Sequence, residues 1–367
     1  MKKMKKMKKM KKIITIVGAR PQFIKAAIVS HALRQQTNAI EMILHTGQHY
    51  DSNMSQIFFD ELDIPKIDFQ LHSQSVTHAT QTSDMMVGIE RVLLEQKPDF
   101  LLIYGDTNST LAGALVAAKL HIPIAHVEAG LRSYNRKMPE EINRLVADQL
   151  SDILFTPTKE ASKNLLSEGF SLQKILEVGD VMYDAALFYG EKAMRTSSSY
   201  ENNYILATIH RAENTNDKNK LLNIFTALEK LCATFPVIMP LHPRTRKIID
   251  TYDSNLLKKT KIKMIDPVGF LDMIRLEKNA RLIMTDSGGV QKEAFFYNVP
   301  CITLRDETEW TETVELKWNR IVPPLDSDFI CQIAMESIHT QGIVDQYPYG
   351  MGQASTQIAQ HLMDMIH

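Results

Sequence analysis

The sequence predicts an α/β protein with two doubly wound parallel sheets that face each other across a cleft. Short apolar runs, typical of strands buried on both faces, alternate with longer segments whose apolar residues recur every three or four positions. The alternation stops at a polar stretch, residues 191–203, and then starts again. The 367 residues are enough for two domains with separate cores. In sheets of this kind, ligands bind beyond the carboxyl ends of the strands.

Residues 1–12 consist of four Met-Lys-Lys repeats. The apolar run that follows is five residues long, which is too short for the core of a secretory signal. We therefore expect a disordered basic tail. Binding of this tail to a membrane surface or to nucleic acid is the alternative.

The apolar runs of the first half are expected to be strands at residues 13–17, 40–45, 100–104, 122–127 and 153–156. Among the amphipathic segments between them, helices are expected at residues 23–36, 83–96 and 109–120. In the second half, strands are expected at residues 204–208, 237–240, 263–265, 282–285 and 301–304, and a final helix at residues 353–365. The predicted division is a basic tail (1–12), an N-terminal domain (13–190), a linker (191–203), a C-terminal domain (204–350) and a terminal segment (351–367). The amphipathic pattern of the terminal segment fits packing on either half, the N-terminal one included.

Composition and charge exclude several classes of protein. The formal net charge is -1 and the pI is about 6.9, so the chain has no basic field that could hold nucleic acid. Its three cysteines lie far apart, which argues against a disulfide framework or a cysteine-based zinc site and fits a reducing cytosol. Since no apolar run approaches the roughly 18 residues of a membrane span, we expect a soluble cytoplasmic protein.

A glycine-rich turn follows one strand of the second half. Residues 281–296 read as a strand, the turn Asp286-Ser287-Gly288-Gly289 and a helix. Glycines let a ligand approach the backbone closely, and the N–H groups at a helix start attract anions. The turn therefore predicts a phosphate site, with an ordinary loop and a serine cap as the alternative. Its spacing matches neither the phosphate loop of nucleoside triphosphatases nor the dinucleotide fingerprint.

A helix N-terminus alone is too weak to hold a phosphate ligand. It contributes about 1 kcal/mol, up to about 2, whereas millimolar binding takes about 4 kcal/mol. Side-chain cations must supplement the turn, and the candidates are His242 and Arg305, which follow expected strands. His210 also follows a strand. For both histidines, a solvated or satisfied side chain without a ligand is the alternative.

Acidic residues follow two strands of the first half. Asp106 and Glu128 are expected to point into the same cleft mouth, because parallel strands end at the same edge of a sheet. Glu140 and Glu141 fall in the first turn of the next expected helix, where Glu141 is expected to be a dipole partner only. Crowded carboxylates raise one another's proton affinity, so one can act as a base while another acts as an acid. A capping or loop-bracing role is the alternative for Asp106 and Glu128, as is a divalent-ion site, although no metal-binding motif accompanies them.

Cations lie near the start of the helix after the first strand. Arg20 and Lys25 stand, with Gln22, at or close to this helix start. Positive side chains are electrostatically misplaced there unless an anion is present.

Seven motifs carry a resemblance that runs from about residue 13 to residue 310, in order and at family spacing. They are GARPQFIK (18–25), GDTNST (105–110), HVEAGLR (126–132), PEEINR (139–144), TIHRAEN (208–214), PLHPRT (240–245) and TDSGGVQKE (285–293). Together they resemble the non-hydrolysing UDP-N-acetylglucosamine 2-epimerase family.

The resemblance implies a glycosyltransferase-B-like fold of two Rossmann-type domains, a homodimer, no cofactor and no metal. It also implies a UDP-sugar substrate whose UDP is held mainly by the second domain. The residues implied to bind the diphosphate and ribose, or to lie alongside, are Ser287, Gly288, Gly289, Glu293, His242, Phe270 and Arg305. The residues implied to be catalytic are Asp106, Glu128, Glu140 and His210, and those implied to line the cleft are Arg20, Lys25 and Arg144.

The reaction of this family explains why several acids are needed. The C2 proton of the sugar is not acidic enough for direct removal and return. The family eliminates UDP across C1–C2 to give a 2-acetamidoglycal and then adds UDP back, with a proton on the opposite face of C2. Which of Asp106, Glu128 and Glu140 takes the proton and which returns it stays open. The product is expected to feed surface polysaccharide synthesis.

Two departures from the family pattern bear on the sugar. Ala19 and Gln22, and the segment 46–54, differ from the GTRPE and QHREM motifs of members that act on UDP-N-acetylglucosamine. They look more like the subgroup that epimerises UDP-2,3-diacetamido-2,3-dideoxyglucuronic acid. We therefore predict a UDP-2-acetamido-sugar 2-epimerase with the C3 and C6 substituents open. The alternatives are a UDP-sugar glycosyltransferase of the same fold, a hydrolysing 2-epimerase, and a nucleotide-sugar-binding regulator without turnover.

Overall fold

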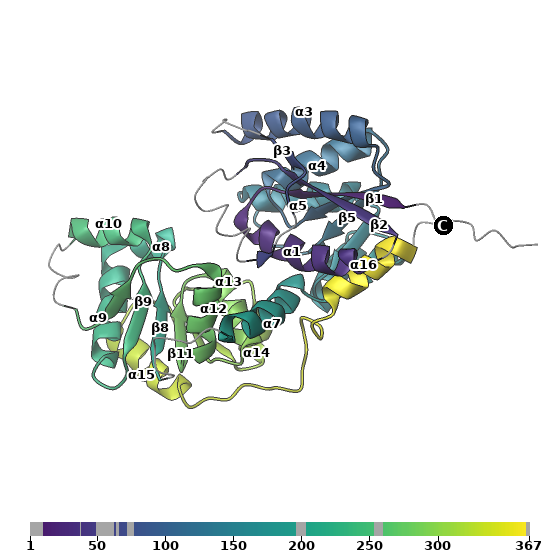
Figure 1. Cartoon of the computed structure of the whole chain (residues 1–367). Coiled ribbons are helices and arrows are strands. Elements are labelled where there is room, and N and C mark those ends of the chain that lie inside the picture. The colour runs from purple at the N-terminus through teal and green to yellow at the C-terminus, as the bar shows by residue number, and fades with distance from the viewer. Residues whose placement is uncertain are drawn as a thin grey trace, which may run out of the picture. The chain divides into compact units, whose positions relative to one another are not determined.

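A computed structural model of the chain describes residues 10–36, 38–48, 62–63, 66–71, 77–195, 203–252 and 260–364. The chain forms two compact units (Figure 1). Unit 1 takes in the residues up to Ala185 together with Pro348–His367, and unit 2 comprises Ala186–Tyr347. Most of the expected tail (1–9), most of the expected linker (196–202) and part of the motif at 46–54 lie outside the described residues.

The elements of unit 1 are β1 (Lys11–Val17), α1 (Arg20–Arg34), β2 (Ala39–His45), β3 (Phe69–Gln70), α3 (His78–Gln96), β4 (Phe100–Tyr104), α4 (Asn108–Lys119), β5 (Ile124–Val127), α5 (Pro139–Leu150), β6 (Ile153–Thr156), α6 (Lys159–Ser167), η1 (Leu172–Lys174), β7 (Ile175–Glu177) and α16 (Ala354–Asp364). Helix α7 (Val181–Met194) crosses the boundary between the units. The elements of unit 2 are β8 (Ile205–Thr208), α8 (Ala212–Thr215), α9 (Lys218–Leu231), β9 (Val237–Pro240), α10 (Pro243–Tyr252), β10 (Lys263–Ile265), α12 (Phe270–Asn279), β11 (Leu282–Thr285), α13 (Gly288–Phe296), β12 (Cys301–Thr303), α14 (Thr311–Glu315), β13 (Asn319–Ile321) and α15 (Ser327–Ser337).

Each unit contains a parallel sheet, so the predicted α/β class with two doubly wound sheets is confirmed. In the described parts of the chain, the strand order is β3-β2-β1-β4-β5-β6-β7 in unit 1 and β10-β9-β8-β11-β12-β13 in unit 2. Both orders reverse next to the first strand of the unit, between β1 and β4 and between β8 and β11. This reversal is the switch point at which doubly wound sheets bind ligands.

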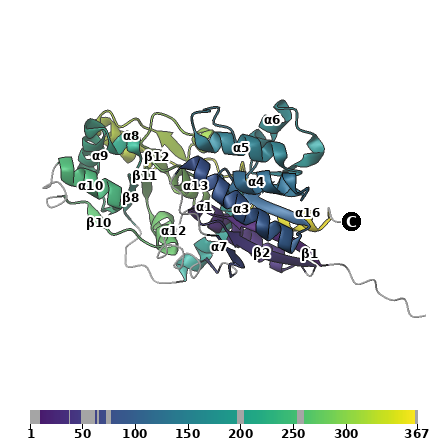
Figure 2. The same cartoon turned by 90° about the horizontal axis from the view of Figure 1, so that it is seen from above.

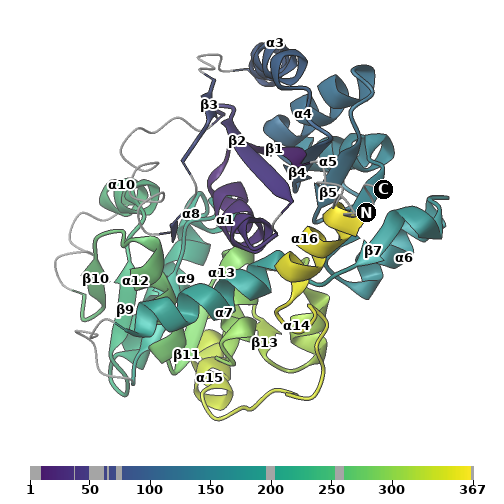
Figure 3. The same ribbon diagram turned by 45° about the vertical axis from the view of Figure 1, so that its right-hand side comes forward.

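Helices cover both faces of the unit 1 sheet. Ile14, Ile16, Leu101 and Ile103 are buried in one apolar cluster with side chains of α3 and α4. Figure 2 shows α3, α4 and α5 side by side over this face. Helices α1 and α16 pack against each other on the opposite face (Figures 1 and 3).

The C-terminal helix α16 belongs to unit 1. Its start is capped by Asp184 of α7, which accepts hydrogen bonds from the N–H groups of Ala354 (3.2 Å) and Ser355 (2.8 Å) and from the Ser355 hydroxyl (2.6 Å). Because Asp184 is buried, these bonds replace the water that its carboxylate loses on folding.

The sheet of unit 2 lies between two apolar clusters. One joins alternate residues of β8, β9 and β11 to α9 and α15, and the other joins the remaining alternate residues to α12 and α13. Alternate residues of a strand point to opposite faces, so each strand feeds both clusters.

The strands differ from the expected runs mainly at their ends. β1 begins at Lys11, two residues before the apolar run, because Lys11 N–H donates to the Asn38 carbonyl (2.8 Å) and Lys12 N–H donates to Asp99 Oδ2 (2.9 Å). Three strands, β3, β7 and β13, were not among the predicted ones. Each has only two or three residues and is defined by its pairing with a neighbouring strand: β3 with β2, β7 with β6 and β13 with β12.

Candidate active site

Glu128 and Lys25 form an ion pair at the carboxyl end of the unit 1 sheet. Lys25 Nζ of α1 lies 2.6 Å from Glu128 Oε2, and both side chains are largely buried. The φ angle of Glu128 is 71°, in the left-handed region that a residue with a side chain adopts only at a cost of about 1–3 kcal/mol. The N–H groups of Glu128 and Ala129 both donate to the Phe155 carbonyl (3.1 and 3.0 Å), which holds this conformation. Strain maintained in this way is typical of functional residues.

Asp106 is paired with Arg144 of α5. The Asp106 carbonyl accepts a hydrogen bond from Asn143 Nδ2 (2.9 Å), so α5 holds both ends of this residue. Thr107, not Asp106, is the N-cap of α4, which excludes the capping alternative for Asp106. The preceding Gly105 has a φ angle of 60°, and a Cβ atom there would lie 3.6 Å from both Glu128 Oε1 and Lys25 Nζ. The backbone at Gly105, just before Asp106, therefore lies close to the Glu128–Lys25 pair.

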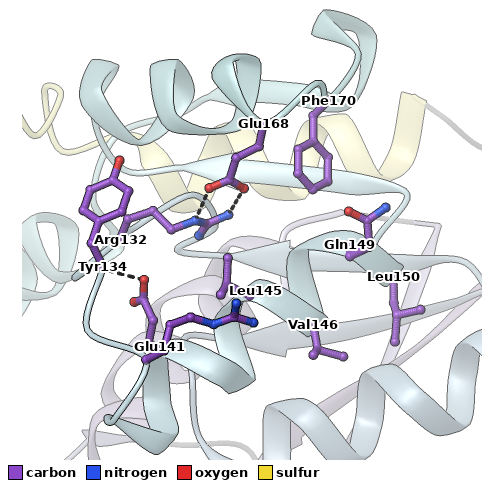
Figure 4. A pocket seen from close by; sticks show the side chains of 10 residues that line it. Arg132, Tyr134, Glu141, Leu145, Val146, Gln149, Leu150, Glu168 and Phe170 are labelled. Carbon is purple, nitrogen blue, oxygen red and sulfur yellow. Dashed lines mark hydrogen bonds and ion pairs between the residues drawn. The ribbon is translucent and has the colours of Figure 1, made fainter.

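The two adjacent acids of α5 have different environments. Glu141 is buried and accepts hydrogen bonds from Ser133 N, Ser133 Oγ and Tyr134 N, all at 2.9 Å (Figure 4). Burial alone would raise the pKa of Glu141, but these bonds and Arg144 lower it overall. Glu141 therefore braces a loop, which is more than the dipole partner that was expected. Glu140 is exposed in the first turn of α5.

Cations balance the carboxylates of unit 1. The sequence led us to expect acids that crowd one another, but Asp106 and Glu128 each face a cation instead. Arg144 also contacts Glu141, with Nη1 lying 3.2 Å from Oε2. Arg20 is exposed at the first position of α1. In this arrangement each cation can turn from its carboxylate to another anion.

A buried histidine, His126, contacts the backbone next to Asp106. His126 Nδ1 is 2.7 Å from Asp148 Oδ1, and its Nε2 is 2.7 Å from the Gly105 carbonyl oxygen. The two ring nitrogens therefore join α5, which carries Asp148, to the loop after β4. Asp148 also accepts hydrogen bonds from Arg132 Nη1 (2.7 Å) and Gly130 N (3.1 Å). Burial would raise the pKa of Asp148, but His126 and Arg132 lower it.

Gln22 ties the ends of β1 and β4 together. Its Oε1 accepts from the N–H groups of Gly18 (2.9 Å) and Ala19 (3.0 Å), and its Nε2 donates to the Tyr104 carbonyl (2.9 Å) and to Thr110 Oγ1 (3.0 Å). An ionised glutamate could accept the first two bonds but could not donate the other two. Gln22 in place of the family's usual glutamate therefore has a structural consequence, because its amide bonds the loop after β1 to the end of β4.

At the switch point of unit 2, between β8 and β11, the central residue is Asp286. It follows β11 directly and is fully buried. Its carboxylate accepts hydrogen bonds from the backbone N–H groups of His210 (3.0 Å) and Arg211 (3.0 Å) and from Asn214 Nδ2 (3.1 Å). These bonds fix the loop after β8 against the loop after β11. Asn214 also donates to the Leu304 carbonyl (2.9 Å), which adds the end of β12.

The start of α13 has the features of an anion site. Ser287 occupies the N-cap position, but its side chain makes no cap hydrogen bond among the described residues, so the serine-cap alternative is excluded. Gly289 is exposed, and a Cβ atom there would meet only Ser287 Oγ, at 3.9 Å. A Cβ atom on Gly288 would lie 2.4 Å from Glu309 Oε1. Since Arg305 Nη1 donates to Glu309 Oε2 (2.9 Å), an acidic side chain and a cation already meet beside this helix start.

The other predicted residues of unit 2 lie after strands β8 and β9 and on helices α12 and α13. The rings of His210 and His242 are brought together, with centroids 5.9 Å apart, and His210 Nδ1 lies 3.6 Å from Asp286 Oδ1. Phe270 is buried at the start of α12, with its ring edge-on to Tyr189 at 5.4 Å. Glu293 lies on α13, partly buried.

A separate pocket of about 530 Å³ lies beside α5 in unit 1 (Figure 4). Its lining includes Arg132, Glu141 and Phe170 but none of the predicted site residues. Within the ranges that the structure describes, no group of three or more His, Cys, Asp or Glu side chains is placed to hold a metal ion. None of the helices described is both long enough and apolar enough to cross a membrane.

Comparison with known proteins identifies the family. The sequence profile described as UDP-N-acetylglucosamine 2-epimerase matches residues 31–363. The chain belongs to the UDP-N-acetylglucosamine 2-epimerase family. This membership confirms the resemblance read from the motifs and the prediction of an isomerase-type enzyme.

Several members of the epimerase family align with almost the whole chain. The chain is 52% identical over 354 residues to a Pseudomonas aeruginosa protein described as UDP-2,3-diacetamido-2,3-dideoxy-D-glucuronate 2-epimerase, covering 95% of this chain and 99% of that protein. The structure of this chain resembles that of the Methanocaldococcus jannaschii UDP-GlcNAc 2-epimerase solved with UDP-GlcNAc and UDP. The TM-score is 0.84 and the identity 43%, and the match covers 96% of this chain and 99% of that one. It also resembles the Neisseria meningitidis UDP-GlcNAc 2-epimerase bound to UDP-GlcNAc, with a TM-score of 0.83, 30% identity, and coverage of 96% and 100%.

Sequence reasoning on this epimerase did not predict the supporting contacts of the site. Gln22 and Asp286 were noted by position only, and His126, Asn143, Asp148 and Glu309 were not singled out. A signal was present for two of them, because His126 stands in an otherwise apolar strand and Asp148 in an amphipathic helix. Their partners come from distant parts of the chain, so the pattern alone did not indicate what they contact.

Proposed function

We propose that this chain inverts C2 of a UDP-2-acetamido sugar by eliminating UDP and adding it back. A carboxylate removes the C2 proton, the C1–O bond to UDP breaks, and its electron pair leaves with the diphosphate, which gives a 2-acetamidoglycal. UDP then returns to C1, and a proton is delivered to the opposite face of C2. The observation that carries this proposal is the pair of carboxylates, Asp106 and Glu128, each held by a cation at the switch point of unit 1.

The ion pairs of unit 1 supply a route to an active base. In the absence of substrate, Lys25 neutralises Glu128 and Arg144 neutralises Asp106. A diphosphate competes for these cations, and Arg20 adds a further positive charge at the start of α1. When the cations turn to the diphosphate, the leaving group is stabilised, and the two carboxylates are released from their ion pairs to face the sugar. Glu140 and His210 complete the proposed catalytic set.

The start of α13 is the proposed diphosphate site. Uncapped N–H groups after Ser287, the open surface at Gly289 and the nearby Arg305 support this assignment. Glu293 is the proposed ribose partner, since a carboxylate accepts hydrogen bonds from ribose hydroxyls. His242 and Phe270 complete the proposed nucleotide set.

The sugar is proposed from the relatives. The Pseudomonas aeruginosa relative is described as acting on a 2,3-diacetamido glucuronate, and the Methanocaldococcus jannaschii structure holds UDP-GlcNAc. Both sugars carry the 2-acetamido group at the reacting carbon. We propose this group as the shared requirement, with the C3 and C6 substituents to be determined by assay. The homodimer, the cytoplasmic location and the role in polysaccharide synthesis stay predictions.

The test uses purified protein in deuterated water with each of the two sugar nucleotides. We expect deuterium at C2 and an equilibrium mixture of the two C2 epimers, both still joined to UDP. Release of a free sugar would favour the hydrolysing alternative. Absence of deuterium from C2 with both substrates would contradict the proposal. Protein with Glu160→Gln, on exposed α6, is the control for an acidic residue outside the site.

A further inference from the structure

We propose that Glu277 is kept protonated at neutral pH and donates a hydrogen bond to Glu293, which makes Glu277 the positioning residue for the ribose carboxylate. Glu277 lies in the last turn of α12 and Glu293 on α13, two helices that pack against each other. The inference rests on the proposed function for the role of Glu293. It concerns a residue that no motif singled out.

The burial of Glu277 is complete, and its two oxygens are unsatisfied. Its exposed fraction is 0%, and neither Oε1 nor Oε2 has a hydrogen-bond partner among the described residues. An ionised carboxylate in such a place would lose its hydration without replacement. Since nothing compensates this loss, the side chain takes up a proton instead.

Among the described residues, the groups that act on Glu277 include no cation. Glu293 acts on it as a negative charge and lies within hydrogen-bonding reach, but two ionised carboxylates cannot bond to each other. Tyr297, just after α13, and Cys301 of β12 also lie near Glu277, and burial raises the pKa of both of these groups. Lys278, the next residue on α12, has its Nζ over the Tyr297 ring, 5.8 Å from the centroid. Burial first, and Glu293 second, raise the pKa of Glu277 well above its ordinary value.

The protonation state decides whether the two acids repel or bind each other. Two carboxylates offer acceptors only, so no hydrogen bond joins them while both are ionised. A proton on Glu277 supplies the missing donor, and a hydrogen bond to a charged acceptor is among the stronger ones in proteins. The bond occupies one side of Glu293 and fixes its rotamer. The remaining lone pairs of Glu293 are then aimed at the ribose hydroxyls.

The test compares two variants that differ only in donor capacity. Glu277→Gln keeps the shape and an N–H donor, whereas Glu277→Met keeps the length and is apolar. We measure the affinity for UDP and for 2′,3′-dideoxy-UDP by calorimetry at neutral pH. We expect Glu277→Gln to bind UDP like the parent protein and Glu277→Met to bind it about tenfold more weakly. Binding of the dideoxy nucleotide is expected to be the same in all three proteins.

Infrared spectroscopy tests the protonation state without relying on the fold of a variant. The parent protein is expected to show the carbonyl band of a protonated carboxylic acid at neutral pH, and this band is expected to disappear in Glu277→Gln. Absence of the band from the parent protein, equal UDP binding by Glu277→Met and the parent, or equal weakening by Gln and Met would each overturn the inference. If the parent protein does not bind UDP at all, the proposed function fails instead, whatever the infrared band shows.

Discussion

At the switch point of unit 1, charged side chains face one another, with Lys25 against Glu128 and Arg144 against Asp106. At the matching point of unit 2, the buried carboxylate of Asp286 is satisfied by backbone N–H groups and an amide, and the start of α13 has no side-chain cap. The two sheets have corresponding strand orders, so topology is not the source of the difference. The shared topology therefore determines at which edge of each sheet a ligand binds. The residues that follow the strands determine whether that edge transfers protons or binds anions.

The largest expected effect is that of Glu128→Gln in unit 1. An amide of the same shape cannot accept the C2 proton, and general acid–base groups contribute about 10²–10⁴-fold to a rate. We expect epimerisation and C2 deuterium exchange to fall by about this factor, while UDP affinity measured by calorimetry does not fall, because Lys25 no longer has Glu128 as a competing partner. Retained exchange in the variant would show that the proton-handling role belongs elsewhere.

A matched pair of substitutions compares how the two units hold their loops. Asp148→Asn in unit 1 removes the carboxylate that pairs with Arg132 Nη1 and leaves Glu168 as the remaining acidic partner of Arg132. Breaking a buried ion pair costs about 3–5 kcal/mol when the remaining charge has no other partner, so a loss of about 3 kcal/mol is expected. Asp286→Asn in unit 2 is expected to lower the free energy of unfolding by less, about 1–2 kcal/mol. The amide oxygen of asparagine still accepts hydrogen bonds from the backbone N–H groups. Denaturant unfolding measures both values. Equal losses in the two variants would contradict the distinction between a charged and a neutral network.

Gly289→Ala tests the anion site of unit 2. The added methyl group meets only Ser287 Oγ at 3.9 Å, so the fold tolerates it, but it stands where a diphosphate approaches the helix start. We expect UDP affinity to fall about 5- to 30-fold, which corresponds to the loss of about 1–2 kcal/mol. The thermal stability is expected to be unchanged. An unchanged affinity would place the diphosphate away from α13.

The smallest expected effect is on acid stability. The pKa of Glu141 is lowered in the folded protein, so its contribution to the free energy of unfolding is complete above the ordinary value of about 4.3 and is lost as the pH falls through the lower folded value. Glu141→Gln cannot ionise. Thermal unfolding from about pH 7 to pH 3 is therefore expected to show a gap between the parent and this variant that narrows as the pH falls below about 4. A gap of constant width would contradict the assignment.

The predicted strands and site positions depended on different signals. Phe100–Tyr104 and Leu282–Thr285 were predicted to the residue, because long apolar runs flanked by turn residues carry their own signal. Asn319–Ile321 could not be found in this way, since it is a strand only through its pairing with β12. Asp106 and Glu128 were found from their places after strands. Their pairing with Arg144 and Lys25 was not, because α5 and α1 supply the cations from distant positions in the chain.

The sequence by itself determined the alternation of strand and helix, the places where polar residues leave the sheets, and the family, since all three are written in local patterns and motifs. Only the tertiary structure decided the charge partners. It placed a cation against each carboxylate in unit 1, a histidine between Asp148 and Gly105, and a buried glutamate without a donor behind Glu293. The physical reason is that proton affinity depends on burial and on neighbours a few ångströms away. Those neighbours come from parts of the chain that only folding brings together.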